Sequence, residues 1–296
     1  MSPPVVAADV GGTQMRAALV DEDGMLLERR AAPTPRHAGV PAALIELVRA
    51  VGADREHGAP SHAVVGLPGS IDYDAGRLLW APNLPPQWPD LLSADQLSSS
   101  LDLPVHVAND ADLAAVGEAL LGAGATSTGV AYLTISTGIG AGVVHGGRLL
   151  RGRRSLAEVG HTIIDWRAWL EGSPCTLEEL GSGSGMARQA HEAGLGELDA
   201  RQVEAVAAAG DGRAQAIWEG AIGACAVGVA NLLMDFSPST VVIGGGLGRR
   251  TEFFDPVRAL VLSRPEHHPD DLAIVPSALG DDAGLVGAAK WLEAAR

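Results

Sequence analysis

Two segments of the sequence share one pattern, in which an apolar run leads into a turn of glycine and threonine and then into a second apolar run. The first is AADVGGTQMRAALVD at residues 7–21, and the second is LTISTGIGAG at residues 133–142. A hairpin needs only a short polar turn, so either segment alone predicts no more than a hairpin. Their positions, each at the start of one half of the chain, indicate two related halves.

Both halves continue in the same order of elements. In the first half we expect strands at 4–9, 15–21 and 26–31, a helix at 41–52, a strand at 62–66, the loop GLPGSIDYDAG, a strand at 104–108, and a helix at 111–121. In the second we expect strands at 129–136, 141–145 and 148–150, helices near 185–193, 199–209 and 212–236, a strand at 240–243, a helix at 252–262, a strand at 272–275 and a closing helix at 282–295. The pattern is β-β-β-α-β-α twice, with a helical insert in the second copy. Duplicated α/β halves usually face each other across a cleft and bind ligands at the carboxyl ends of strands.

Composition excludes several classes of partner. The chain has 296 residues, of which 47% are hydrophobic, and a formal net charge of −15. A surface with this much negative charge repels nucleic acid and anionic lipid. We therefore expect neither a nucleic-acid nor a membrane partner. The short basic run at 151–154 is interpreted as a solvated loop rather than an anion site.

Cysteine content and the first residues favour a cytoplasmic protein. Two cysteines, Cys175 and Cys225, cannot build a disulfide framework. The start, MSPPVVAADV, lacks the basic and apolar regions of a signal peptide. The apolar run at 221–236 is rich in small residues and predicts a buried helix packed closely on a neighbour, not a membrane span.

The glycine turns suit phosphate binding. In the first turn, the amides near Gly11 and Gly12 and the Thr13 hydroxyl can donate to an anion, and Asp9 is placed to hold a hydrated cation. A larger residue at Gly12 is expected to block the phosphate and to force a backbone angle that only glycine tolerates. The second turn supplies Thr137 and Gly138. A third stretch, TVVIGGGLG at 240–248, ends a strand in Gly244, Gly245 and Gly246, which suits close approach of adenosine.

A strand end at 104–110 carries the candidate base. Asn109 and Asp110 follow the strand, and a helix begins directly after them. Asp110 could be only the N-cap of that helix, and Asp112 is equally available as an early-helix carboxylate. An Asn-Asp pair at a strand end near phosphate loops suits proton abstraction from a hydroxyl in phosphoryl transfer.

In combination and order, these segments resemble the ROK family of sugar kinases, within the hexokinase–actin ATPase superfold, over nearly the whole chain. The resemblance rests on DVGGT, STGIGAG, IGGGLG, AND at 108–110, EVGH at 158–161, GLPGSID and APNLPPQW. It implies an α/β, two-lobed actin-like ATPase (ribonuclease H-like) fold with a central cleft. We expect a smaller lobe at 1–110, completed by the C-terminal helix at about 282–296, and a larger lobe at 111–281.

The resemblance also implies roles for individual residues. Asp110 would be the general base, with ATP as co-substrate and Mg²⁺ held by Asp9 through water. The remaining sugar-pocket residues would be Gly69, Asn83, Asn109, Glu158, His161 and Glu178. Glu179 is an alternative to Glu178, and His161 could instead be a core histidine. We also expect a homodimer.

One segment departs from the family pattern. Relatives typically follow Glu-x-Gly-His with Cys-x-Cys-Gly-x-x-Gly-Cys-x-Glu, whose three cysteines bind zinc with the histidine, whereas this chain keeps only Cys175. Asp165 and Glu171 could be further ligands, but structural zinc sites rarely use carboxylates, so no zinc is expected. Packing of Trp166 and Trp169 is expected to hold the loop instead. Asp112 is a smaller departure, because the family commonly has Asn there.

These observations predict an ATP-dependent hexose kinase, with glucose as the first substrate to consider. N-acylmannosamine, fructose or a cyclitol are alternative acceptors, and inorganic polyphosphate is an alternative donor. A ROK-type repressor is disfavoured because it would need a DNA-binding domain before the first strand. A non-catalytic sugar sensor is disfavoured because Asp9, Thr13, Asp110 and Thr137 are all present.

Overall fold

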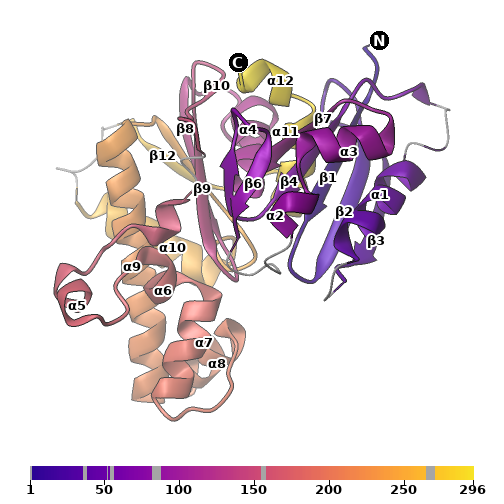
Figure 1. Ribbon diagram of the computed structural model, residues 1–296. Coiled ribbons are helices and arrows are strands. Elements are labelled where there is room, and N and C mark those ends of the chain that lie inside the picture. Colours follow the sequence, from indigo (N-terminus) through magenta and orange to yellow (C-terminus); the bar gives the residue numbers. More distant parts are fainter. Residues whose placement is uncertain are drawn as a thin grey trace. The chain divides into compact units, whose positions relative to one another are not determined.

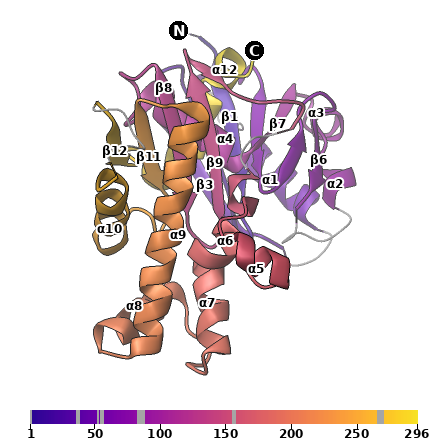
Figure 2. The ribbon, with the colours of Figure 1, turned by 90° about the vertical axis from the view of Figure 1, so that its left-hand side faces the viewer.

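The computed structural model describes residues 2–35, 39–51, 53, 57–81, 88–154, 158–264 and 271–296. The chain forms two compact units (Figures 1 and 2). Unit 1 comprises 1–128, 142–157 and 278–296, and unit 2 comprises 129–141 and 158–277. These units interleave along the chain, and the predicted lobe boundary at residue 110 stays a prediction.

The first sheet contains five strands in the order β3-β2-β1-β4-β7. Its members are β1 (Val5–Val10), β2 (Gln14–Val20), β3 (Leu26–Pro33), β4 (Ala63–Leu67) and β7 (Val105–Asn109). β1, β2 and β3 form an antiparallel meander, while β4 pairs in parallel with both β1 and β7. The parallel strands are almost fully buried, which explains their continuous apolar sequences.

The second sheet repeats this order as β10-β9-β8-β11-β12. Its members are β8 (Gly129–Ile135), β9 (Ile139–His145), β10 (Arg148–Leu149), β11 (Thr240–Gly244) and β12 (Ala273–Pro276). β11 pairs in parallel with β8 and β12, as β4 does with β1 and β7. The predicted duplication of β-β-β-α-β-α is therefore confirmed.

Six helices of the described chain belong to unit 1. They are α1 (Val40–Val51), α2 (Trp88–Leu91), α3 (Ala94–Leu101), α4 (Asp110–Leu121), α11 (Ala283–Ala288) and α12 (Trp291–Ala294). α4 and α11 touch backbone to backbone, because a Cβ on Gly287 would lie 1.9 Å from the Leu113 carbonyl oxygen and one on Gly117 would lie 2.4 Å from that of Ala283. The end of the chain thereby supports the helix that follows Asn109.

Two expectations about unit 1 are wrong. The segment read as a loop, GLPGSIDYDAG, contains β5 (Ser70–Asp72) and leads through a turn into β6 (Arg77–Trp80), its antiparallel partner. The turn residues Asp74, Ala75 and Gly76 dominated that sequence pattern, and the strands beside them are short. The expected closing helix at 282–295 is interrupted, since a 3-10 turn (η4, Gly280–Asp282) precedes α11 and a break separates it from α12.

Unit 2 consists mainly of helices. They are η2 (Glu158–His161), α5 (Trp166–Glu171), α6 (Leu177–Gly181), α7 (Gly183–Glu192), α8 (Ala200–Ala208), α9 (Gly212–Phe236) and α10 (Thr251–Leu262). Contacts join α9 to α6, α7, α8 and α10. α6 was not expected, because its single turn is too short for a periodic pattern.

Small residues allow the long helix α9 to pack closely against its neighbours. A Cβ on Gly228 would lie 2.6 Å from the Leu177 side chain, and one on Gly181 would lie 2.8 Å from the Cys225 sulfur. Within the described residues, α9 alone is long and apolar enough to span a membrane by length and composition, and 56% of its most apolar window is buried inside the protein. The prediction of a buried helix packed closely on its neighbour is confirmed.

Candidate functional site

The first glycine turn joins β1 to β2 in unit 1. Asp9 lies near the end of β1, opposite Arg16 of β2, and their side chains form an ion pair. Gly11 donates its N–H to the Gln14 carbonyl at 3.0 Å, and the Thr34 hydroxyl donates to the Gly11 carbonyl at 2.7 Å. The segment is therefore a hairpin turn, and the phosphate role rests on what surrounds it.

The two glycines of this turn differ. A Cβ on Gly11 would lie 2.8 Å from the Gln14 carbonyl oxygen, whereas one on Gly12 would meet no atom within 4 Å. Gly12 is not in the left-handed region, so the expectation that its backbone angle requires glycine is wrong. Gly12 is exposed, as is Thr13, and open space lies beside it for a ligand.

Asn109, not Asp110, caps helix α4. The Asn109 Oδ1 accepts hydrogen bonds from the backbone N–H groups of Ala111 at 2.8 Å and Asp112 at 3.1 Å. Its Nδ2 donates to the Gly69 carbonyl at 2.9 Å. The alternative in which Asp110 is only the helix cap is therefore wrong. Capping fixes the Asn109 amide and leaves Asp110 at the first position of the helix.

The Asp110 carboxyl group titrates near neutral pH. Asp110 as a whole residue is exposed, but surrounding protein atoms displace water from its carboxyl group, which favours the neutral form. The negative charge of Asp9 also favours the neutral form. Asp112 contributes further, and together these raise the pKa of Asp110 to about 7. A carboxylate with such a pKa can accept a proton from a hydroxyl at physiological pH.

Asp112 is held behind the strand end. It is fully buried, and its Oδ2 accepts a hydrogen bond from the Tyr73 hydroxyl at 2.5 Å. The same hydroxyl accepts the backbone N–H of Asn109 at 3.2 Å. Burial and the Asp112 charge raise the pKa of Tyr73 well above its usual value, so the phenol stays protonated as the donor. Asp112 therefore makes a structural contact, and the side-chain oxygen of an asparagine at this position could accept the same hydrogen bond.

Gly69 lies beside this group and must be glycine. Its φ is +95°, and a Cβ there would lie 2.3 Å from the Trp80 carbonyl oxygen. Because its own carbonyl accepts from Asn109, Gly69 helps to orient the Asn109 amide. Asn83, predicted to line the same pocket, lies outside the described residues.

Unit 2 brings together Glu158, His161 and Glu178. The Glu158 Oε2 lies 3.7 Å from the His161 Nε2 on the 3-10 helix η2. Burial is the main cause that raises the pKa of Glu158, with the Glu178 charge adding to it and His161 opposing it. The His161 side chain is 46% exposed, so the reading of His161 as a core histidine is wrong.

The structure separates Glu178 from Glu179. The Glu178 Oε2 accepts the Ile139 N–H at 2.8 Å and lies against the turn at Gly138, where a Cβ would approach it within 2.6 Å. Glu179 instead completes a capping box with Thr176 at the start of α6. Glu178 is thereby the acid beside the glycine turn, and Glu179 holds the preceding loop.

The loop without the family's cysteine cluster is held by hydrogen bonds. Ile164 and Asp165 donate their N–H groups to the Cys175 carbonyl, and Leu177 donates to that of Thr162. Trp166 and Trp169 are 60% and 56% exposed, so the expectation that they hold the loop by packing is wrong. Both lie on the six-residue helix α5, which buries none of its residues.

The residues that the structure describes contain no group of three or more His, Cys, Asp or Glu side chains able to hold a metal ion. Asp165 caps α5 through its Oδ1, and Glu171 is exposed. The expectation of a chain without structural zinc stays a prediction.

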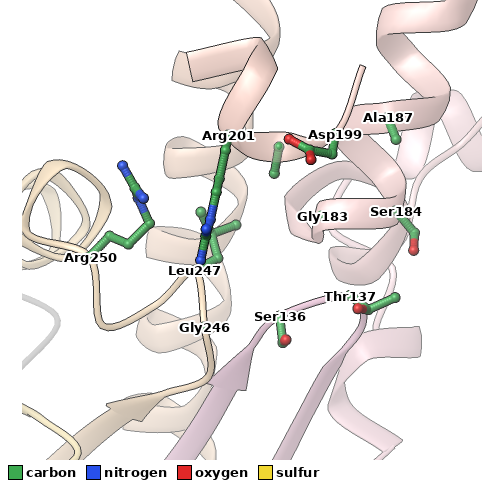
Figure 3. A pocket seen from close by; sticks show the side chains of 11 residues that line it. Ser136, Thr137, Gly183, Ser184, Ala187, Asp199, Arg201, Gly246, Leu247 and Arg250 are labelled. Carbon is green, nitrogen blue, oxygen red and sulfur yellow. The ribbon is translucent and has the colours of Figure 1, made fainter. Parts of the chain in front are cut away.

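A pocket of about 370 Å³ lies in unit 2 beside the second glycine turn (Figure 3). Ser136 and Thr137 from that turn line it together with the start of α7, the start of α8 and the turn after β11. The α7 amides of Gly183 and Ser184 donate to the carbonyls of Ser136 at 2.8 Å and Thr137 at 3.0 Å. The helix therefore fixes the shape of the turn.

The three consecutive glycines at the end of β11 and in the turn after it have different surroundings. A Cβ on Gly244 would lie 2.2 Å from the Tyr132 hydroxyl oxygen, and one on Gly245, whose φ is +82°, would lie 2.3 Å from the Ile135 carbonyl oxygen. Gly246 alone of the three lines the pocket. Gly244 and Gly245 are thus required by the packing of the sheet, which positions Gly246.

Sequence reasoning missed the charged residues of this pocket. Asp199, Arg201 and Arg250 line it, and Figure 3 shows the Arg201 side chain extending toward Leu247, with the Arg250 side chain to its left. Arg250 pairs with Glu204 at 2.6 Å, while its buried Nε has no hydrogen-bond partner among the described residues. No motif marks these residues; the helix N-cap pattern at Asp199 was the nearest signal.

Comparison with known proteins places the chain in a family. The family model described as ROK matches residues 5–295. This chain belongs to the ROK family. With the two matching sheets, that membership confirms the expected mixed α/β fold of the actin-like ATPase type.

Individual ROK relatives align along nearly the whole chain. The bifunctional enzyme NanE/NanK of Brucella melitensis biotype 1 is 39% identical over 292 residues, covering 97% of this chain and 54% of that protein. This chain therefore spans about half the length of that relative. The N-acetylmannosamine kinase of Shigella boydii serotype 18 is 35% identical over 302 residues, covering 96% of both. The ROK family glucokinase from Streptomyces griseus, solved with glucose and AMPPNP, has a TM-score of 0.79 at 30% identity, covering 97% of this chain and 98% of that one.

Proposed function

We propose that this chain is a sugar kinase that transfers the γ-phosphoryl group of ATP to a hydroxyl of a hexose, with Asp110 as the general base. The observation that carries the proposal is the state of Asp110: Asn109 caps the helix, one Asp110 carboxylate oxygen (Oδ1) accepts the Ala111 N–H at 2.9 Å, and the pKa of the carboxyl group is about 7. The glucokinase with bound glucose and AMPPNP supports both the acceptor class and the donor class.

Unit 1 holds the groups proposed to act on the attacking hydroxyl and on the transferred phosphoryl group. In unit 1, Asp110 takes the proton of the attacking hydroxyl. The side-chain amide of Asn109, which caps α4, donates one hydrogen to Gly69 and has the other left to donate to a sugar. The turn at Gly11, Gly12 and Thr13 is proposed to contact the transferred phosphoryl group.

In unit 2, Glu158, His161 and Glu178 are proposed to bind the other hydroxyls of the sugar. Carboxylates and an imidazole pair well with fixed hydroxyls, and they disfavour ligands that leave them unpaired. The pocket at Thr137 and Gly246 is proposed to hold the nucleotide, with Arg201 and Arg250 supplying donors for its oxygens.

A magnesium ion fits the acidic residues of unit 1. The charge of Asp9 raises the pKa of Asp110, so two carboxyl groups share one region, and a divalent cation would relieve their repulsion. Asp9 would hold the ion through water, in exchange for part of its pairing with Arg16. When bound with the nucleotide, such an ion neutralises charge on the phosphates.

The acceptor is open between two kinds of sugar. Glucose is supported by the glucokinase, and N-acetylmannosamine by the kinase of Shigella boydii. Fructose and a cyclitol are further acceptors to test, and polyphosphate is a further donor.

We further propose that the protein is a homodimer in the cytoplasm. Light scattering after size-exclusion chromatography would test the oligomeric state.

The test is a coupled ADP-release assay with MgATP over hexoses, N-acylated amino sugars and cyclitols. We expect turnover with glucose or N-acetylmannosamine, and a loss of about a hundredfold or more in kcat for Asp110→Asn. Glu171→Gln, on the exposed helix α5, serves as the matched control and should retain full activity. No turnover with any acceptor, using ATP or polyphosphate, would refute the proposed kinase activity.

A further inference from the structure

A second pocket of about 310 Å³ lies entirely in unit 1. It is lined by parts of β7, by α12 and the two residues that follow it, and by the segments around Tyr73, Ala94 and Arg151. The lining residues are Tyr73, Gly76, Ala94, His106, Val107, Arg151, Trp291, Leu292, Ala295 and Arg296. We propose that this pocket binds a small organic anion with a flat apolar body, and that Arg151 faces the anionic group.

The charge of the lining favours an anion. Arg151 and Arg296 are basic, His106 can hydrogen-bond, and none of the described lining residues has a carboxylate side chain. A basic lining is notable in a chain with 36 acidic and 21 basic residues. Residues 151–154 are all exposed, as predicted for a solvated loop, and the Arg151 side chain is in addition anchored in unit 1.

Arg151 is held ready for such a ligand. Its Nη2 donates to the Ala295 carbonyl at 2.9 Å, and its guanidinium lies 5.0 Å from the centre of the Tyr73 ring. Anchoring one edge and stacking one face reduces the entropy that the guanidinium loses when it binds an anion. A neighbouring arginine, Arg153, is committed instead to the buried Asp72 at 3.1 Å.

The aromatic residues favour a flat body. The rings of Tyr73 and Trp291 lie 5.7 Å apart at an angle of 40°, and Trp291 is almost fully buried. Val107, Ala94 and Leu292 add apolar surface. Aromatic walls with one anchored cation are the combination that retains an aromatic or alicyclic acid rather than a bare inorganic ion.

Tyr73 also connects this pocket to the start of α4. Its ring contacts Arg151 and Trp291, while its hydroxyl bonds Asp112 and the Asn109 backbone. A ligand that moves the ring would therefore disturb the residues that precede and follow Asp110. This link rests on the proposed function of Asp110; ligand binding itself does not.

The binding test is calorimetry with 2-naphthoate, in the presence of ADP so that a nucleotide occupies its own pocket. Acetate tests charge alone, 2-naphthol tests the apolar body alone, and 1-naphthyl phosphate distinguishes phosphate from carboxylate. We expect one naphthyl anion per chain, bound about tenfold or more weakly by Arg151→Gln. Arg148→Gln, an equal loss of charge at an exposed site on β10, should change affinity by less than about twofold.

Two outcomes would overturn the binding proposal. One is equal affinity of the wild type and Arg151→Gln, and the other is no binding of either naphthyl anion up to about 10 mM. The link to Asp110 is tested separately with Tyr73→Phe, which keeps the ring and removes the hydroxyl. We expect 2-naphthoate to change kcat of the wild type but not of Tyr73→Phe; an equal response, or none in the wild type, would exclude the link.

Discussion

The side chain of Glu179 accepts a hydrogen bond from the backbone N–H of Cys175 across 3.0 Å. The same Oε2 accepts the Thr176 N–H at 3.0 Å and contacts the Thr176 hydroxyl at 3.0 Å. One carboxylate thus holds together the residues at the end of the loop that precedes α6. The next helix begins there, and Glu178 is its second residue.

Replacing Glu179 by alanine should destabilise the protein. Loss of a capping interaction costs about 1 kcal/mol, which corresponds to a fall of about 2–4 °C in Tm for a chain of this size. Hydrogen bonds from Cys175 and Thr176 lower the pKa of Glu179, so its contribution is present above the unfolded value of 4.5 and is lost as pH falls. Calorimetric melting at pH 7 and pH 4 should therefore show a larger difference at pH 7. Glu171→Ala is the control, and an equal loss in that variant would contradict the assignment.

Asp110→Asn should raise stability while it removes activity. The folded pKa of about 7 lies above the unfolded value of 3.8, so ionised Asp110 destabilises the folded state at alkaline pH. The gain in Tm should be larger at pH 8 than at pH 5. If the variant melts below the wild type at pH 8, then the carboxylate is stabilised by contacts and its pKa is not raised.

The pH profile of the wild type should reflect the same group. With Asp110 as base, kcat/KM should fall as pH drops below about 7, because protonation removes the acceptor. Asn109→Asp keeps the oxygen that caps α4 but places another negative charge beside Asp110, so the acid limb should move to higher pH. Asn109→Ala loses the cap and should cost about 1 kcal/mol of stability. An unmoved acid limb in Asn109→Asp would assign that limb to another group.

The first glycine turn predicts a contrast between two variants. Gly12→Val should leave Tm unchanged, because open space surrounds that position, but should weaken nucleotide binding if phosphate approaches there. Asp9→Ala should mainly lower kcat and raise the magnesium requirement, as expected for loss of the cation's partner. Gly245→Ala is the structural control and should unfold readily, since its Cβ would clash with the Ile135 carbonyl. Normal turnover in both Gly12→Val and Asp9→Ala would mean that the first glycine turn is only a hairpin turn, without a role in phosphate binding.

Sequence pattern was sufficient where local signals agree. Strands around Asp9 and Asn109 carry apolar runs that end in turn or cap residues, and both glycine turns follow directly from them. The buried helix α9 was equally accessible, because its small residues mark close packing. These features depend on neighbours along the chain, which a sequence displays.

Features that depend on distant contacts were not predictable. Arg250 reaches the pocket because α10 begins after the glycine turn, and its partner Glu204 is 46 residues earlier. Glu179 and Glu178 are adjacent and chemically identical, so only the capping geometry separates their roles. Trp166 is exposed although it is hydrophobic, because a helix of six residues offers too little surface to bury it.

The close crossing of α4 and α11 orders events during synthesis. Gly117 leaves the ribosome 170 residues before Gly287, whose helix packs against the same stretch of backbone. Unit 1 cannot complete its core until residues 278–296 have been made, while unit 2 is already fully synthesised by residue 277. A nascent chain stalled before residue 283 should therefore present a protease with an open first unit and a protected second one, so that the half which starts first finishes last.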